Sequence, residues 1–420
     1  MGLPEPHGGR LVDRTLAPAA SERRRSEAAA LPSVRLSEEA AFDLEKIAVG
    51  AYSPLTGFQG SADLEAILER GRLADGTPWS LPILLPQPPT EAIGPRGPGI
   101  GDEVLLEAPS GRPIGLLRLE EVYPIPKARV AERVYGTTDP AHPNVGDLVA
   151  APSHAWAGPI QLLDWPDLPD RSLERTPAEM RARFQARGWS NVAAYQCRNP
   201  PHTAHELLQR QTLEREEIDG LLIHPVVGRL KPGDYRPQII LRAYRVLTER
   251  YLPADRVELA SLSISMRYAG PRAALFLAIV RKNFGCRSYI VGRDQAGVGR
   301  YYEPTAAQRI FDEYPDLGVV PIRFAESFYC RRCQWMASPR SCGHAPADRI
   351  DTSQSRIRRQ LADGEPLPPE LLRPEVAEIL REPDPFVPAA PPSAAAVRPD
   401  RAEAPSSGGA TPAVAGPLSR

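Results

Sequence analysis

Short apolar segments alternate with longer amphipathic segments between residues 171 and 325. The short segments predict strands at residues 191–195, 221–227, 257–263, 287–291 and 319–324. The longer segments predict helices at residues 176–187, 202–216, 238–250, 271–283 and 304–314. Because a helix separates consecutive strands, we expect an α/β fold whose parallel sheet is covered on both faces. Ligands of such sheets bind at the carboxyl ends of the strands.

The N-terminal pattern, over residues 1–170, predicts a small β-rich domain. Residues 1–35 are rich in Pro, Arg and Ala and are expected to be irregular. Ser37 is a good N-cap for a helix over residues 38–48, and a second helix is expected over residues 62–71. Strands are predicted at residues 80–85, 103–107 and 114–122, with turn-forming residues between them.

The pattern after residue 325 divides into two parts. Residues 326–385 contain a group of cysteines and a helix predicted over residues 355–362, and we expect a small domain there. Residues 386–420 are mostly Pro, Ala, Ser and Gly without periodicity, which predicts a disordered tail. The predicted domains are therefore residues 1–170, 171–325 and 326–385, followed by the tail.

Candidate chemistry gathers where the strand at 191–195 ends and the next helix begins. The polar residues there are Gln196, Cys197, Arg198, Asn199, His202 and His205. Pro200 and Pro201 end the strand and favour a helix start. His202 and His205 are three residues apart, so they share one face of the first helical turn, where free N–H groups attract anions. This pattern predicts a phosphate site, and simple surface caps are the alternative.

Three further polar segments follow the next predicted strands, at residues 224–234, 265–272 and 292–299. The last is rich in glycine, so its backbone can approach a ligand closely, and Arg293 can bind an oxyanion through two N–H groups. It is not a P-loop, because no Lys-Ser/Thr pair ends it. Since all these segments follow strands of one parallel sheet, we expect them to meet at one edge.

The composition limits the classes of function. The formal net charge of −1 gives no general attraction to nucleic acid or to a membrane surface. The N-terminus lacks the apolar segment of a secretory signal, and the longest apolar segment, residues 273–280, is too short to span a membrane. Five cysteines, three of them within residues 330–342, suit a reducing compartment with one metal site better than disulfides. We therefore expect a cytoplasmic protein without nucleic-acid or membrane partners.

Taken together, the motifs resemble those of the ATP sulfurylase (sulfate adenylyltransferase) family, over roughly residues 5 to 385. The matching motifs are Gln-x-Arg-Asn-Pro-x-His-x-x-His at 196–205, Met-Arg-Tyr-Ala-Gly-Pro-Arg at 266–272 and Gly-Arg-Asp-x-Ala-Gly-x-Gly at 292–299. The resemblance implies a PUA-like N-terminal domain, a Rossmann-like nucleotidyltransferase domain and a small zinc-bearing C-terminal α/β domain. No Walker A sequence occurs, so we do not expect the kinase that is fused to some relatives.

The resemblance implies a reaction in which a sulfate oxygen attacks the α-phosphorus of MgATP and pyrophosphate leaves. Catalysis would then consist of positioning and charge stabilisation. The catalytic residues implied are Cys197, Arg198, Asn199, His202 and His205. The residues implied to bind ATP or sulfate are Gln196, Arg198, Asn199, Met266, Arg267, Gly292, Arg293, Asp294, Gln295 and Ala296. Arg198 and Gln196 would hold sulfate, whereas Met266 and Arg267 would shape the wall of the site.

Among the positions that depart from the family pattern, Cys197 and Gln295 are predicted site residues. Cys197 stands where the family usually has Thr, and we interpret it as a buried substitute and not as a nucleophile. Gln295 replaces the His of the Gly-Arg-Asp-His loop and can never carry a positive charge, which predicts weaker phosphate binding or a slower reaction. The alternative hypothesis is therefore a nucleotide-binding relative with lost or altered activity.

The cysteines predict a metal site of the structural type. Three thiolates and one imidazole form a closed tetrahedral zinc set, and the candidates are Cys330, Cys333, Cys342 and His344. Unligated cysteines in a surface loop are the alternative. Bacterial and archaeal ATP sulfurylases look similar here, and bacterial relatives suggest a homodimer. The same site would serve sulfate assimilation or the reverse reaction from adenylylsulfate and pyrophosphate.

Overall fold

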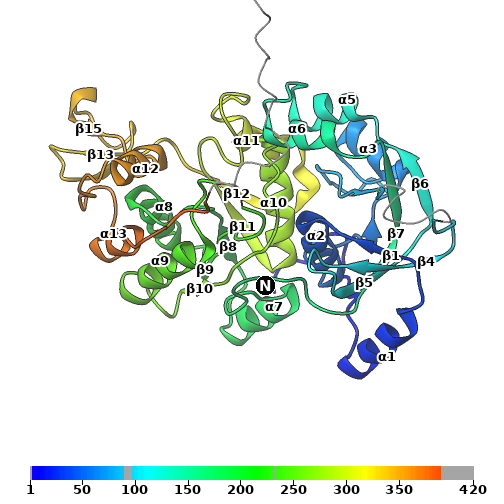
Figure 1. Cartoon of the computed structure of the whole chain (residues 1–420). Coiled ribbons are helices and arrows are strands. Elements are labelled where there is room, and N and C mark those ends of the chain that lie inside the picture. The colour runs from blue at the N-terminus through cyan, green and yellow to red at the C-terminus, as the bar shows by residue number, and fades with distance from the viewer. Residues whose placement is uncertain (1, 89–96, 231, 389–420) are drawn as a thin grey trace, which may run out of the picture.

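The computed structural model describes residues 2–88, 97–230 and 232–388. Three parts follow one another across the molecule, and each contains a β-sheet (Figure 1). The N-terminal sheet lies at one end, the central sheet with its helices lies in the middle, and the small C-terminal sheet lies at the other end. The mixed α/β fold expected from the sequence is confirmed.

The N-terminal part is built around one long strand that pairs with several others. Its strands are β1 (Ser33–Arg35), β2 (Gly57–Phe58), β3 (Leu85–Pro86), β4 (Glu103–Glu107), β5 (Pro113–Arg118), β6 (Glu121–Pro124) and β7 (His154–Leu162). Strand β7 is antiparallel to β2, β3, β5 and β6, while β4 joins β5 to β1. Its helical segments are α1 (Pro18–Ala28), α2 (Glu38–Ala48), α3 (Ser61–Arg70), α5 (Lys127–Val130), η1 (Ala131–Tyr135) and α6 (Pro143–Ala150).

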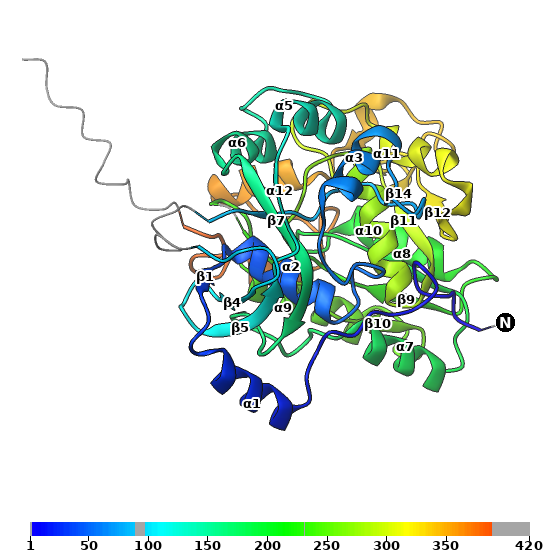
Figure 2. The same ribbon diagram turned by 90° about the vertical axis from the view of Figure 1, so that its right-hand side faces the viewer.

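Two helices of this part agree with the sequence and one contradicts it. Helix α2 begins after Ser37, whose hydroxyl accepts the Ala40 N–H at 3.2 Å, as predicted. The prediction that residues 1–35 are irregular is wrong, because α1 forms with Pro18 in its first turn. Helix α1 lies at the margin of the N-terminal part in both ribbon views (Figures 1 and 2). Its mostly polar sequence hides it from pattern analysis, since only Ser21 and Ala28 are buried.

Two of the predicted N-terminal strands also need correction. Residues 81–84 are not in a strand, and only β3 follows them. Leu81 and Ile83 are nevertheless fully buried, so their apolar pattern reflects burial in an irregular segment. The predicted strand 114–122 is two strands, β5 and β6, because the chain bends between them and both pair with β7.

The central part is the predicted parallel sheet. Its strands are β8 (Val192–Tyr195), β9 (Gly220–Ile223), β10 (Val257–Leu259), β11 (Cys286–Val291) and β12 (Val320–Arg323). They lie in the order β10-β9-β8-β11-β12, and every pairing is parallel. The helical segments are α7 (Pro177–Ala186), α8 (Thr203–Leu213), α9 (Pro237–Arg250), α10 (Pro271–Asn283), α11 (Ala306–Arg309), η2 (Ile310–Glu313) and η3 (Pro315–Leu317). The helix predicted over 304–314 is therefore a short α-helix continued by a 3-10 turn.

The C-terminal part is small and packs beside the central sheet. Its segments are β13 (Phe328–Cys330), β14 (Trp335–Ala337), η4 (Pro346–Asp348), β15 (Arg349–Ile350), α12 (Gln354–Ala362) and α13 (Pro374–Leu380). The predicted tail falls mostly on residues 389–420, which lie outside the described residues. Its first residues are ordered, since Phe386 forms an isolated antiparallel β-bridge with Tyr235 and the Val387 N–H donates to the Asp234 carbonyl at 2.8 Å.

The N-terminal and central parts share a buried boundary. Phe276 of α10 packs edge-on against Tyr52 and Trp79, with ring centroids 5.1 and 5.6 Å apart. Lys46 of α2 is buried and contacts Glu174 at 2.8 Å and the Ser263 hydroxyl at 2.8 Å. This buried contact fixes α2 against the segment that follows β10.

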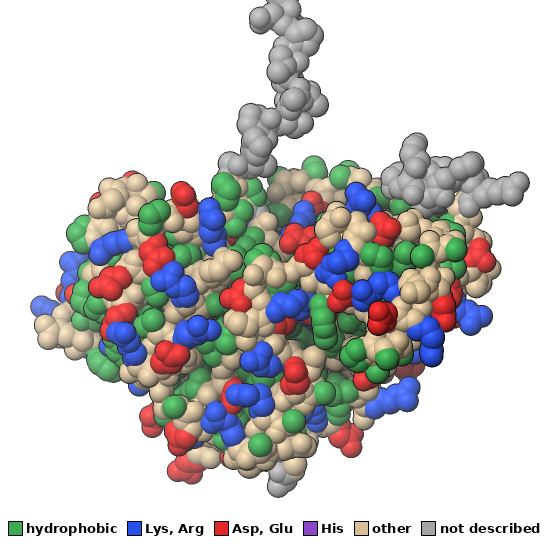
Figure 3. All heavy atoms as spheres, turned by 60° about the horizontal axis from the view of Figure 1, so that its bottom comes forward, with side chains coloured by type: hydrophobic (Ala, Val, Ile, Leu, Met, Phe, Trp, Pro, Cys, Tyr) green, Lys and Arg blue, Asp and Glu red, His purple; other side chains and the backbone are tan. Residues whose placement is uncertain are grey.

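The surface agrees with the near-zero net charge. Figure 3 shows Lys, Arg, Asp and Glu side chains interspersed over the face that it displays. In the part of the chain that the structure describes, no helix is both long and apolar enough to cross a membrane.

Candidate active site

A cavity of about 520 Å³ lies at the carboxyl edge of the central sheet. The end of β8, the start of α8, the segment after β11 and parts of the C-terminal domain form its walls. The predicted site residues that line it are Gln196, Cys197, Arg198, Asn199, His202, His205, Met266, Gly292, Arg293, Asp294, Gln295 and Ala296. Residues up to 100 positions apart in the sequence therefore face one another here, as the sheet topology predicts.

The turn between β8 and α8 gives this edge its shape. Strand β8 is buried along its whole length and ends at Tyr195. Pro200 and Pro201 separate it from α8, and His202 has the extended backbone of an N-cap residue. The helix start therefore faces the cavity with His202 and His205 on its first turn.

The two histidines are stacked, with ring centroids 3.7 Å apart. Burial, and then the charge of His205, lowers the pKa of His202 well below its ordinary 6.5, so His202 is neutral at pH 7 in this ligand-free structure. Its Nδ1 atom is buried and has no hydrogen-bond partner among the described residues. A buried ring nitrogen without a partner beside a cavity is well suited to meet an oxygen of a ligand.

Cys197 lies against His205 in the same wall. Its Sγ atom is 3.8 Å from Nε2 and 3.9 Å from Nδ1 of that ring, and it accepts the Asn199 N–H at 3.3 Å. Burial alone would raise the pKa of the thiol, but the charge of His205 and these hydrogen bonds outweigh it and bring the pKa down to about 6.

Arg198 is held by two neighbouring segments. Its guanidinium donates to the Tyr268 hydroxyl at 2.7 Å and lies over the Tyr268 ring, 4.8 Å from the centroid. Asp234 approaches it at 3.6 Å. The Tyr268 carbonyl in turn accepts the Tyr302 hydroxyl at 2.8 Å. The one cation of the β8–α8 turn is thus oriented before any anion binds.

The segment after β11 has an unusual backbone. Asp294 and Ala296 have positive φ angles of 54° and 56°, a conformation that is uncommon for residues other than glycine. Such local strain is often retained where a backbone must point its amides at a ligand. Arg293 pairs with Glu326 of the C-terminal part at 2.8 Å across the cavity.

Gln295 uses its amide within the wall. Its Nε2 donates to the side-chain Oε1 of Gln196 at 2.8 Å and to the Tyr289 hydroxyl at 3.1 Å. The residue that departs from the family pattern therefore joins β11 to the turn after β8.

Arg267 is the exception among the predicted residues, because it does not line the cavity. Its guanidinium is buried against the N-terminal domain, where it contacts Asp43 at 2.5 Å and Glu39 at 3.1 Å. The expectation that Arg267 shapes the wall directly is corrected accordingly. The side chain instead anchors the segment that carries Met266 and Tyr268 to α2.

Sequence analysis missed part of the cavity. The segment between β12 and β13 and the segment before α12 contribute a wall whose residues are Ala325, Glu326, Ser327, Asp351, Thr352 and Ser353. From α12, Arg358 donates to the Asn199 Oδ1 atom at 2.9 Å and Gln354 donates to the Pro200 carbonyl at 2.8 Å. For this region the sequence predicts only the helix over residues 355–362.

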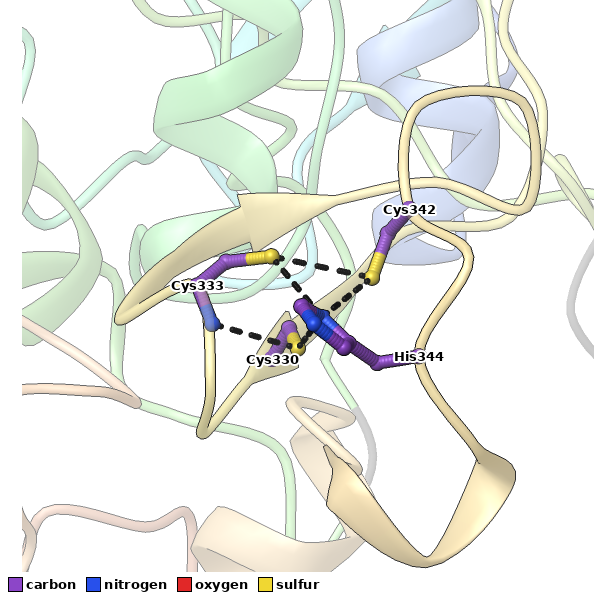
Figure 4. A group of neighbouring side chains, drawn as sticks. All are labelled: Cys330, Cys333, Cys342 and His344. Carbon is purple, nitrogen blue, oxygen red and sulfur yellow. Dashed lines mark hydrogen bonds between the residues drawn. The ribbon is translucent and has the colours of Figure 1, made fainter.

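The predicted metal ligands converge in the C-terminal part. The side chains of Cys330, Cys333, Cys342 and His344 point toward one another (Figure 4), and their ligand atoms lie within 4.8 Å of one another. The His344 Nδ1 atom is 3.3–3.5 Å from the three sulfurs, and the Cys333 and Cys342 sulfurs are 3.7 Å apart. A tetrahedron with Zn–S of about 2.3 Å and Zn–N of about 2.0 Å requires S···N and S···S separations of about 3.5 and 3.8 Å. The residues therefore fit a tetrahedral metal ion.

Sequence comparison identifies the two larger parts. The sequence model of a PUA-like domain matches residues 4–165, and that of ATP-sulfurylase matches residues 171–383. A sulfate adenylyltransferase of Symbiobacterium thermophilum is 47% identical over 379 residues, covering 90% of this chain and 95% of that protein. One from Cenarchaeum symbiosum is 44% identical over 385 residues, covering 91% and 98%.

Structural comparison agrees. The chain is similar to a structure described as a hexameric APS kinase from Thiobacillus denitrificans, with a TM-score of 0.71 and 29% identity. The match covers 91% of this chain and 69% of that one. The sequence motifs, the fold and these relatives lead to one conclusion, that the chain belongs to the ATP sulfurylase family.

Proposed function

We propose that the chain is a sulfate adenylyltransferase, which converts MgATP and sulfate into adenylylsulfate and pyrophosphate. The observation that carries the proposal is one cavity where Arg198, the two stacked histidines and the segment around Gln295 meet. The sulfate adenylyltransferases that match along nearly the whole chain support it. No finding supports the alternative of a relative without this activity.

In this proposal, each group has a role that its chemistry permits. Arg198 holds two sulfate oxygens with its planar guanidinium, and Gln196 supports it. A sulfate oxygen then attacks the α-phosphorus in line with the departing pyrophosphate. Asn199 steadies the α-phosphoryl oxygens, while Arg293 contacts the nucleotide side.

The histidines and the backbone would supply the rest of the stabilisation. The unpartnered Nδ1 of His202 can donate to a phosphate oxygen when it carries the proton, and the anion would favour the charged imidazole. His205 extends this contact from the same helical turn. The amides around Ala296 contact sulfate, and Met266 closes the wall. No nucleophilic side chain is needed, so Cys197 has no covalent role in the reaction.

Pyrophosphate release from MgATP tests the proposal. We expect release that requires sulfate and a product that comigrates with adenylylsulfate. Release at the same rate without sulfate would refute it. Arg198→Ala should reduce activity by at least about 10³-fold, because the transition state loses a charged, bidentate contact. Arg250→Ala, which removes an exposed guanidinium paired with Glu375, is the matched control.

We also propose that Cys330, Cys333, Cys342 and His344 hold Zn²⁺ in a structural site. A set of four protein ligands leaves no open position for catalysis. The cluster links Cys330, the last residue of β13, to His344. The chain continues from His344 to the cavity wall at residues 351–353. Metal analysis of purified protein should find about one zinc per chain, and protein that is fully stable without metal would contradict this assignment.

For the assembly, we propose a homodimer, as the resemblance to bacterial relatives suggests. The similar solved structure is described as hexameric. Light scattering of the full-length chain distinguishes the two states.

A further inference from the structure

Cys197 has surroundings that differ from those of a buried structural thiol. Its Sγ atom lies beside the His205 ring, 3.8–3.9 Å from both nitrogens, and it accepts a backbone N–H from Asn199. Two tyrosines, Tyr195 and Tyr244, face it from β8 and α9. Cationic and hydrogen-bonding neighbours of this kind stabilise a thiolate.

The pair also opens onto space that a small molecule can enter. Both Cys197 and His205 line the cavity of about 520 Å³. His202, which stacks on His205 and also lines the cavity, is more than nine-tenths buried, and its Nδ1 has no partner among the described residues. The cavity therefore offers a thiol, an imidazole beside it and a polar atom still lacking a hydrogen bond.

Cys286, a buried thiol that does not line the cavity, provides a contrast within the same chain. Burial raises the pKa of Cys286 to about 12, so that thiol stays protonated. The neighbours of Cys197 lower its pKa to about 6, so its thiolate is far more accessible near neutral pH than that of Cys286. Since the thiolate is the reactive form, the two thiols should differ greatly in reactivity.

We propose that Cys197 is a modification site, at which small hydroperoxides and carbon electrophiles react with the thiolate held by His205. With a hydroperoxide, the sulfur attacks one peroxide oxygen, an S–O bond forms and the O–O bond breaks. The alkoxide or hydroxide leaves with the bonding electron pair and takes a proton from solvent or from His205. The sulfur is oxidised to a sulfenic acid while the peroxide is reduced.

The sulfenic acid can be reversed by a thiol. Attack of the thiol on sulfur releases water and forms a mixed disulfide, and a second thiol releases Cys197 as the free thiol. In the oxidised state an extra oxygen stands beside Arg198 and Asn199, and the thiolate charge is lost. Resting on the proposed function, we infer that this oxygen occupies space required by sulfate or phosphate, so oxidation stops the reaction reversibly.

Alkylation of the full-length protein tests the site without relying on activity. Iodoacetamide is added at pH 7 for short times, and mass spectrometry measures the alkylated fraction at each cysteine. We expect Cys197 to react at least tenfold faster than Cys286, with a rate that rises around pH 6. In His205→Asn, the rate at pH 7 should fall about tenfold and the midpoint should move upward. If Cys286 is not alkylated in the His205→Asn variant, that variant is folded. Equal rates at the two cysteines, or no effect of His205→Asn, would overturn the proposal.

Peroxide treatment tests the consequence. We expect activity to fall in proportion to sulfenic acid trapped at Cys197 and to return with a thiol reductant. Cys197→Thr should retain a larger fraction of its own starting activity under the same treatment. Full activity in protein oxidised at Cys197 would refute the blocking role. Fast alkylation in a protein that never forms adenylylsulfate would refute only the proposed function.

Discussion

Removal of the Arg267 guanidinium is the perturbation whose outcome the structure predicts best. Arg267 is 8% exposed and its partner Asp43 has 2% side-chain exposure, and the pair joins the segment after β10 to α2. The variant Arg267→Met keeps much of the side-chain volume and removes the charge. It leaves the buried Asp43 carboxylate without its cation.

The expected cost follows from that isolated carboxylate. Breaking a buried pair by removing one partner costs about 3–5 kcal/mol. At about 2–4 °C per kcal/mol for a cooperative unit of 150–250 residues, the melting temperature should fall by about 6–20 °C. Burial already raises the pKa of Asp43 to about 6 with Arg267 present. Without Arg267, the pKa should rise further, so the destabilisation should grow as the pH increases from about 5 to 8.

Differential scanning fluorimetry at several pH values measures the effect. The control is Arg242→Met, because Arg242 has a similar charge contact with Glu382 but is half exposed. It should shift the melting temperature little. Asp43→Asn combined with Arg267→Met should be more stable than Arg267→Met alone, since no buried carboxylate remains unpaired. Equal shifts in the Arg267 and Arg242 variants, or a double variant less stable than Arg267→Met, would refute the reasoning.

Three other changes have defined outcomes. Cys333→Ser should lower zinc content and melting temperature more than it lowers the turnover of the folded fraction, measured by metal analysis and pyrophosphate release. Glu206→Gln should destabilise the protein at pH 7 and progressively less below about pH 4.5, because Arg373 and Arg210 hold the pKa of Glu206 below its usual value despite burial, and that stability disappears as pH falls through the lowered pKa. Gln295→His should lower kcat/KM for MgATP about fivefold above pH 7, since one of two hydrogen bonds worth about 1 kcal/mol is lost. Its ratio to wild type should recover below about pH 7, where the imidazole gains a proton; a ratio independent of pH would show that position 295 has no contact with phosphate charge.

The fold was predictable where burial follows secondary-structure periodicity. The inner strands β8, β9 and β11 are almost entirely buried and separated by helices, so their apolar segments stand out, and β8 and β11 were placed within one residue. The apolar pattern predicts the wrong secondary structure where a buried segment is irregular or a helix is exposed. Leu81 and Ile83 are buried without forming a strand, whereas the polar helix α1 buries almost nothing.

The site was predictable to the extent that its residues lie at strand ends. The sheet topology brings Gln196, Asn199 and the segment after β11 together without any further information. The sequence does not predict that the Arg267 side chain points away from the cavity, because its partner Asp43 lies more than 200 residues away in the other domain. The same holds for Arg358, whose contact with Asn199 spans 159 residues and depends on how the C-terminal domain packs.

The wall that the C-terminal domain adds to the cavity has a consequence for biosynthesis. Residues 351–358 complete a site whose other walls, at residues 196–205, emerge from the ribosome much earlier. Contacts between such distant positions form late in folding. A truncated or incompletely folded chain would therefore keep a central sheet yet lack a finished cavity. In this protein, acquisition of activity during synthesis should report that the last domain has docked.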